Sequence, residues 1–195
     1  MFTGPQDSVY PKMTDLHISF LSSIEVTPEL DRQIDSLDRL AFSGEDHTTE
    51  IDSIAWASHE WMALGCLDDG TTPGVLATQF CLLKREILVG GEPVWVAGVG
   101  GVATRPEWQK HGLASQLLRA AQTFMRAEIQ VPFGLLICAN ERQHFYASCG
   151  WQSVAQTLYF TQDNHQRALK TCVMILPLAD QLWPAGEIDL RGLPW

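Results

Sequence analysis

The chain has 195 residues, and its 23 Asp and Glu residues outnumber its 13 Lys and Arg residues, which gives a formal net charge of -10. This length predicts one domain with a sizeable core. The acidic balance argues against a nucleic acid or an anionic membrane as the main partner, because both attract clustered basic residues. The sequence contains no apolar run long enough to span a membrane and does not start like a secretory signal, so we expect a cytoplasmic protein.

The periodicity of apolar residues predicts the secondary structure in chain order. Residues 1–15 form a loose lead-in, and the domain covers 16–195 with an irregular tail from 179 onwards. The expected strands are 16–22, 60–67, 75–89, 93–104, 133–139, 153–161 and 171–176. The expected helices are 28–44, 111–128 and 141–148, and 44–57 is a further short helix or a loop. Hairpins followed by a strand–helix–strand–helix–strand run indicate an α/β (α+β) domain with a mixed sheet.

Neither the cysteines nor the histidines indicate a metal site or a disulfide framework. The five cysteines form no C-x-x-C pair, and the six histidines show no metal-ligand spacing. We therefore expect no bound metal.

The polar loop after the strand 93–104 is the clearest candidate binding site. It leads into a helix through Gln109-x-x-Gly112-x-Ala114, with Lys110 and His111 in between. Unpaired N–H groups at a helix start attract anions such as a pyrophosphate. The run Gly98–Gly101 mimics a dinucleotide-binding fingerprint, but it lies inside a strand and far from the helix start, so we reject that interpretation.

Two motifs, one after the other along the chain, resemble those of the GCN5-related N-acetyltransferase (GNAT) superfamily. The first is Arg105-Pro106 followed by Gln109–Ala114, and the second is Asn140–Trp151, in which Tyr146 precedes Gly150-Trp151. The resemblance implies acetyl-CoA as cofactor and a mostly antiparallel sheet of six to seven strands, splayed at the cofactor site and flanked by about four helices. It implies cofactor contacts from Val102, Ala103, Thr104, Gln109, Lys110, His111, Gly112, Leu113, Ala114 and Asn140.

The resemblance also implies a mechanism of direct acetyl transfer to a neutral amine, a small-molecule substrate. It places Tyr146 as the general acid, and a phenol suits this role because its pKa lies above that of a thiol.

Two branches of the superfamily are similar to this chain. Aminoglycoside 2'-N-acetyltransferases resemble it in Gly101-Val102-Ala103 and in Tyr146-Ala147-Ser148, and nodulation N-acyltransferases in the tail Trp183-Pro184-Ala185-Gly186. Both resemblances imply an amino-sugar acceptor, and the acidic charge favours a polycationic aminoglycoside.

The chain departs from the aminoglycoside branch at Gly100, where that branch implies a glutamate that helps to take the proton of the substrate amine. Substitute carboxylates could come from Glu45, Asp46, Glu50, Glu187, Asp189 or the α-carboxyl group of Trp195. This departure leaves an inactive CoA-binding sensor open as an alternative. The similarity to the nodulation branch leaves a second one, an N-acyltransferase with a longer acyl donor. The resemblance further implies a homodimer as a candidate assembly.

Overall fold

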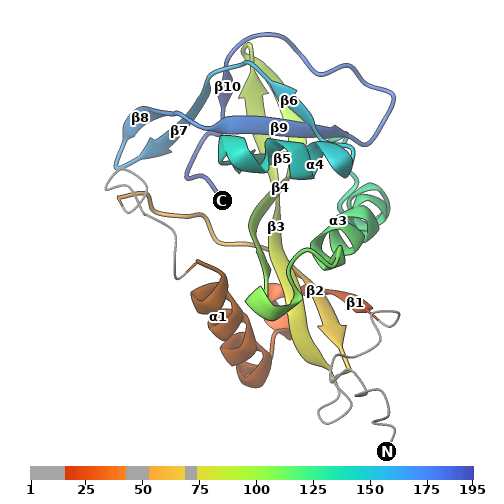
Figure 1. Cartoon of the computed structure of the whole chain (residues 1–195). Coiled ribbons are helices and arrows are strands. Elements are labelled where there is room, and N and C mark those ends of the chain that lie inside the picture. Colours follow the sequence, from red (N-terminus) through yellow and green to blue (C-terminus); the bar gives the residue numbers. More distant parts are fainter. Residues whose placement is uncertain (1–15, 43–52, 69–73) are drawn as a thin grey trace, which may run out of the picture.

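The computed structural model describes residues 16–42, 53–68 and 74–195, which form a curled sheet of ten strands and three α-helices (Figure 1). The helices are α1 (Pro28–Phe42), α3 (Leu113–Phe124) and α4 (Gln143–Ser148). The strands are β1 (His17–Ser22), β2 (Trp61–Leu67), β3 (Val75–Val89), β4 (Glu92–Thr104), β5 (Phe133–Cys138), β6 (Gln152–Val154), β7 (Leu158–Gln162), β8 (His165–Leu169), β9 (Cys172–Pro177) and β10 (Ile188–Asp189).

The long hairpin β3–β4 is the spine of the sheet. Strands β2 and β10 pair with the two ends of β3, whereas β5, β9 and β6 follow in that order beyond β4. Among the described strands, only the pairs β4–β5 and β10–β7 are parallel. The hairpin therefore joins the half of the sheet that carries α1 to the half that carries α4.

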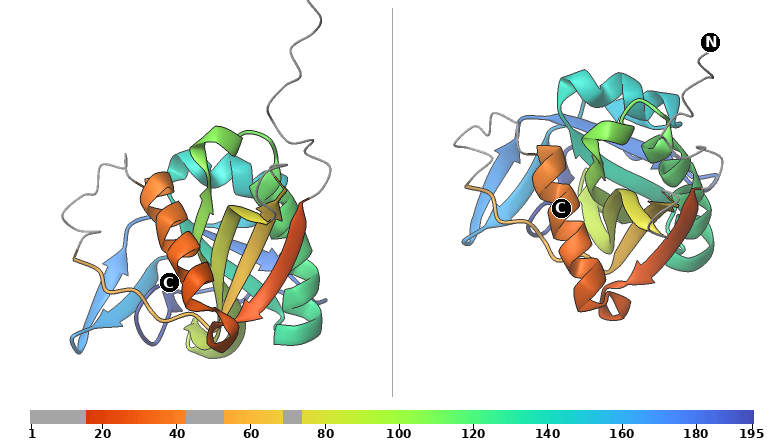
Figure 2. Two further views of the ribbon diagram at one scale, coloured as in Figure 1. Left: turned by 90° about the horizontal axis from the view of Figure 1, so that it is seen from below. Right: turned by 60° about the horizontal axis from the view of Figure 1, so that its bottom comes forward.

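Apolar side chains cover both faces of this sheet. Helix α3 packs Leu117 and Leu118 onto one face, as its helical spacing of apolar residues predicts. The other face holds Leu37 of α1 in one cluster and Trp195 of the tail in another. Figures 1 and 2 show α1 and the C-terminus on one side of the sheet and α3 on the other. The two faces of β4 therefore meet different elements.

The structure confirms the α/β (α+β) class and the mixed, mainly antiparallel sheet. It splits the expected strand 153–161 into β6 and β7 and adds β8 and β10, which raises the seven expected strands to ten. It places three α-helices in the described residues, and most of the fourth expected segment, 44–57, lies outside them. None of the described helices is long and apolar enough to cross a membrane.

Helix α3 begins and ends differently from the expected range 111–128. It starts at Leu113 because Gly112, with a φ of 79°, takes a left-handed conformation that α-helices do not continue. It ends at Phe124, and a π-helical turn, Met125–Ile129, completes the segment.

Strand β8 is the last strand on the path of the sheet and has no neighbour beyond it in the described residues. Its side chains from His165 to Ala168 are exposed. The hairpin β7–β8 therefore presents an open, polar edge.

Candidate active site

The sheet splits at the centre of the molecule. Parallel pairing of β4 with β5 ends at Val99 and Leu136, and β4 then continues to Thr104 with β3 as its only partner. The rest of β5 stays paired with β9. The backbone groups of β4 that face β5 beyond Val99 therefore have no strand partner, and they can pair with an extended ligand.

A β-bulge lies at the start of the split. Gly100 faces Cys81 and Ala103 faces Gln79, so two residues of β4 stand opposite Phe80 of β3 alone. Gly101 is one of these two and has a φ of 62°, which is the left-handed region. A bulge of this kind bends its strand, and here it turns β4 away from β5.

The loop between β4 and α3 is exposed and open at the helix start. The four residues from Gln109 to Gly112 are all exposed, and no atom lies within 4 Å of the place where a Cβ of Gly112 would be. Lys110 has a φ of 64°, and no side chain caps α3. The first N–H groups of this helix and the charge of Lys110 are therefore available to an anion.

Hydrogen bonds fix the shape of this loop. The Gln109 side chain donates from Nε2 to the Thr104 carbonyl at 3.2 Å, and Arg105 donates from Nε to the Leu76 carbonyl at 2.8 Å. The hydroxyl of Thr104 lies 2.9 Å from that of Thr78.

The other expected cofactor contacts differ in how far they are exposed and in the element that carries them. Val102 lies on the unpaired part of β4, Ala114 is partly buried in the first turn of α3, and Asn140 is exposed at the carboxyl end of β5. Ala103 and Leu113 are 2% and 1% exposed, so only their backbones can meet a ligand.

Tyr146 of α4 lies in the core cluster on the α3 side of the sheet, together with Val99 and Leu136. It is 9% exposed, its ring contacts that of Phe145, and no described residue forms a hydrogen bond with its hydroxyl group. Burial raises the pKa of Tyr146, and nearby Cys138 raises it further. The phenol therefore stays protonated at neutral pH and can donate a proton.

Trp195 lies on the opposite side, against Gly98 and Gly100 of β4. Its indole covers Gly98 so closely that a Cβ there would overlap the ring. A Cβ at position 100 would lie 2.6 Å from the carboxyl carbon of Trp195. The main-chain carbon and oxygen of Trp195 thus occupy the space in which a side chain at position 100 would begin.

Arg85 of β3 holds this end of the tail in place. Its guanidinium lies 5.2 Å from the centre of the Trp195 ring, and its Nη1 donates to the Leu193 carbonyl at 2.5 Å. Trp195 also donates from Nε1 to the Leu135 carbonyl of β5 at 3.4 Å.

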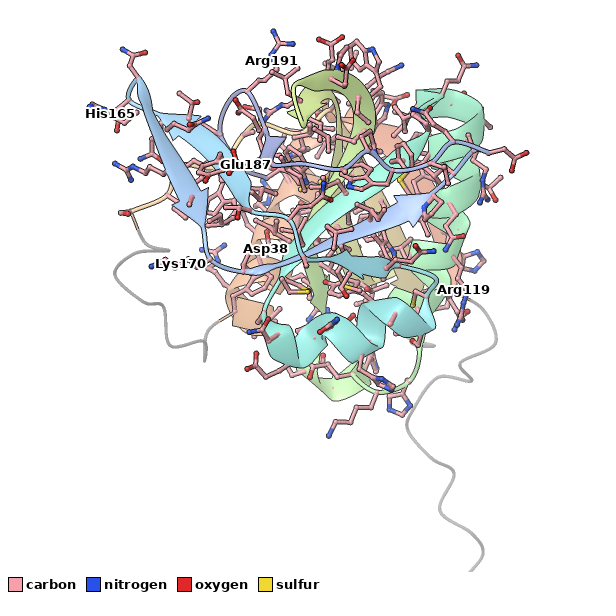
Figure 3. All side chains as sticks on the ribbon, turned by 90° about the horizontal axis from the view of Figure 1, so that it is seen from above. Asp38, Arg119, His165, Lys170, Glu187 and Arg191 are labelled. Carbon is pink, nitrogen blue, oxygen red and sulfur yellow. The ribbon has the colours of Figure 1, made fainter. Side chains whose placement is uncertain are left out.

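The remaining expected carboxylates are either outside the described residues or far from the split. Glu45, Asp46 and Glu50 lie outside the described residues. Asp189 pairs with Leu88, seven positions along β3 from Cys81 and hence roughly 20 Å from Gly100. Its carboxylate accepts hydrogen bonds from Arg191 N and Gln166 Nε2. Glu187 lies on the segment that leads into β10 (Figure 3). We therefore leave Asp189 and Glu187 out of the site.

The structure adds a carboxylate that sequence reasoning missed. Asp38 of α1 is half-buried and accepts a hydrogen bond from Nε2 of Gln79, a residue of β3, at 2.7 Å. Desolvation by burial raises the pKa of Asp38, and the hydrogen bond from Gln79 offsets part of this shift. The charge of Asp35 raises the pKa as well, whereas His59 lowers it. The only signal in the sequence was the place of Asp38 beside the apolar residue Leu37 in the expected helix.

Comparison with known proteins identifies the family. Residues 25–154, which are 130 of the 195 residues, match the model of the acetyltransferase (GNAT) domain. The chain therefore belongs to the GNAT acetyltransferase family and is an acyltransferase of that family. This membership agrees with the expected cofactor, acetyl-CoA.

Solved structures share the fold at low sequence identity. The chain is similar to the GNAT family N-acetyltransferase YhbS from Escherichia coli in complex with CoA, at 16% identity and a TM-score of 0.61 over 98% of this chain and 99% of that one. It is also similar to a GNAT family acetyltransferase from Brucella melitensis in complex with acetyl-CoA, at 15% identity and a TM-score of 0.57 over 90% and 96%. An acyl-CoA N-acyltransferase from Pseudomonas aeruginosa matches at 16% identity and a TM-score of 0.55 over 83% and 99%.

The raised pKa of Asp38 predicts how stability depends on pH. Because the folded state binds this proton more tightly than the unfolded state does, ionisation of Asp38 makes unfolding easier as the pH rises through the folded pKa. Asp38→Asn removes this cost and can still accept the hydrogen bond from Gln79. We expect a higher Tm than wild type at pH 8, and a difference that shrinks toward pH 4, near the ordinary pKa of an aspartate. A lower Tm of the variant at pH 8, measured by scanning calorimetry, would contradict this.

Proposed function

We propose that the protein is an acetyl-CoA-dependent N-acetyltransferase that acts on a primary amine of an amino sugar, with an aminoglycoside-like compound as the preferred class. One observation carries the proposal: a buried phenol and a carboxyl group lie on opposite faces of the sheet, beside the strand that leads into the split. Tyr146 belongs to the cluster on the α3 side, and Trp195 lies against Gly98 and Gly100 on the other side.

The residues around the split suit acetyl-CoA. The N–H groups at the start of α3 and the side chain of Lys110 would hold the pyrophosphate, and the free edge of β4 beyond Val99 would pair with the amide-containing arm. When bound, acetyl-CoA supplies an acetyl thioester, whose C–S bond is exchanged for the C–N bond of the product amide.

Tyr146 is the proposed general acid. It belongs to the cluster on the α3 side and, because its pKa is raised, it stays protonated at neutral pH, so its hydroxyl would be available to donate to the leaving sulfur. Tyr146 would donate its proton to the sulfur that leaves the acetyl group, and the second proton that the acetylated nitrogen loses would restore the phenol.

The α-carboxyl group of Trp195 is the proposed proton acceptor. It fills the place of the missing side chain at position 100, and it lies on the face of β4 opposite to Tyr146. An amine that approaches from the α1 side meets this carboxylate first and loses its proton there, which leaves the nitrogen neutral for attack.

The acceptor class rests on weaker support than the chemistry. The aminoglycoside branch shares the residue order around Tyr146 with this chain, and the net charge of -10 favours a cationic substrate. The tail Trp183–Gly186 is similar to the nodulation branch, which supports a longer acyl donor as the second candidate.

The direct test is thiol release from acetyl-CoA in the presence of a panel of amines, with aminoglycosides, simple amino sugars and aliphatic amines as members. We expect release with amino sugars above the background without amine. Tight CoA binding by calorimetry without release from any amine or donor would instead support the inactive sensor. Faster release from a long-chain acyl-CoA than from acetyl-CoA would favour the acyltransferase.

Tyr146→Phe tests the general acid. Loss of the hydroxyl removes the proton donor but keeps the packing of the ring, so we expect kcat to fall about 100-fold or more while the Kd of CoA stays unchanged. Tyr159→Phe is the matched control, because Tyr159 lies on β7 and its hydroxyl donates to Glu187. Equal kcat values for the Tyr146 variant and wild type would remove this residue from the mechanism.

Conversion of the Trp195 α-carboxyl group to a carboxamide, by semisynthesis, tests the proton acceptor. The amide keeps the shape of the group and removes its basicity, so we expect kcat to fall about 100-fold at pH 7. Semisynthesis of the unmodified chain by the same route controls for handling. Full activity of the amide would show that another group takes the proton.

A further inference from the structure

A carboxylate–amide pair joins α1 to the sheet beside the proposed amine site. Asp38 Oδ1 accepts from Nε2 of Gln79 at 2.7 Å, and the same Nε2 donates to the Ile34 carbonyl at 3.2 Å. Both donors of the amide are thus directed at α1, and no described residue donates to Asp38 Oδ2. This arrangement fixes the carboxylate with one oxygen toward the sheet and one oxygen free.

The side chain of Gln79 makes these two hydrogen bonds while its own oxygen stays buried and unpaired. It is only 1% exposed, and its Oε1 accepts no hydrogen bond from the described residues. A buried acceptor without a partner destabilises a fold, and such groups call for a functional explanation. The unpaired carbonyl also adds negative potential next to Asp38, which favours a cation there.

The pair lies at the bulge of the split. Gln79 and Cys81 are two residues apart on β3, so their side chains share the face that α1 covers. They pair with Ala103 and Gly100 of β4. The thiol of Cys81 donates to the Gly100 carbonyl at 3.2 Å. Burial raises the pKa of this thiol to about 11, and the nearby charge of Asp38 is a smaller contribution in the same direction. Asp38 is therefore close to Cys81 and, through it, to the site of the missing side chain.

We propose that Asp38 binds a protonated amino group of the acceptor while a second, neutral amine of the same molecule is acetylated at Gly100. This inference rests on the proposed function, and it narrows the acceptor to compounds with at least two amino groups. It also assigns Gln79 as a positioning residue, which acts on the acceptor only through Asp38.

An ammonium group suits this subsite chemically. It has three N–H donors and no acceptor, and the free oxygen of Asp38 offers the charged acceptor it needs. A half-desolvated carboxylate gains more from a cation than a solvated one does, because less water must be displaced. The pKa of Asp38 is raised in the free protein because burial outweighs the hydrogen bond from Gln79 and the effect of His59.

Paired acceptors test the inference. A diamino sugar is compared with its monoamino counterpart, and an aliphatic diamine with the monoamine of equal chain length. A hydrogen bond to a charged group supports roughly a 10- to 100-fold preference for the diamine in kcat/KM. In Asp38→Asn we expect this preference to disappear through a higher KM for the diamine, with the KM for acetyl-CoA unchanged.

Asp35→Asn is the matched control, since it removes the same charge from the exposed side of α1, one turn before Asp38. It should keep most of the diamine preference. Asp38→Ala serves as a second variant, and thermal unfolding of each variant confirms that it is folded. The inference is overturned if wild type and Asp38→Asn prefer the diamine to the same extent. It is also overturned if wild type shows no preference for the diamine.

Calorimetry separates this inference from the proposed function. Titration of the CoA-bound protein with the diamine needs no turnover, and we expect binding by wild type and Asp35→Asn but at least 10-fold weaker binding by Asp38→Asn. Absence of thiol release with every amine would refute the proposed function alone. Diamine binding that is absent, or equally tight in wild type and Asp38→Asn, would refute the subsite even in an active enzyme.

Discussion

The loss of pairing between β4 and β5 after Val99 and Leu136 is the constraint on which the rest of the site depends. Beyond this point β4 has no strand on its β5 side, although it lies at the centre of the sheet. Its polar backbone groups on that side are left without strand partners, which is unfavourable unless something else pairs with them. The bulge at Gly101 turns β4 outward, and the loop that follows ends at the open start of α3. One backbone distortion therefore creates both the gap and the route to an anion-binding helix.

The local parts of this arrangement could be predicted from the sequence. The order Gln109-x-x-Gly112-x-Ala114 after an apolar strand indicated the loop and the helix, because turn and helix-start signals are short-range. The α-carboxyl group of Trp195 could only be named as one of several candidates, since its place against Gly100 depends on the path of the whole tail. Strands β8 and β10 were missed because His165–Leu169 begins with three polar residues and does not alternate, and Ile188–Asp189 is too short to show a period.

Asp38 shows a further limit of sequence reasoning. In an amphipathic helix a charged residue beside Leu37 looks like part of the solvated face, and nothing local indicates that a buried amide 41 residues away will contact it. That contact sets a desolvated carboxylate against an amide with an unpaired oxygen, and the fold gains little stability from either. Local strain and unpaired polar groups of this kind concentrate at functional sites, where binding a ligand relieves them.

The open edge at β8 has a consequence for solubility. An edge strand with unpaired N–H and C=O groups is a template onto which a strand of another molecule can add, and flat apolar edges begin aggregation in this way. Here His165, Gln166 and Arg167 project as polar or charged side chains from that edge. Stacking of further strands against them would bury these side chains without partners, so the composition of β8 disfavours aggregation through this edge.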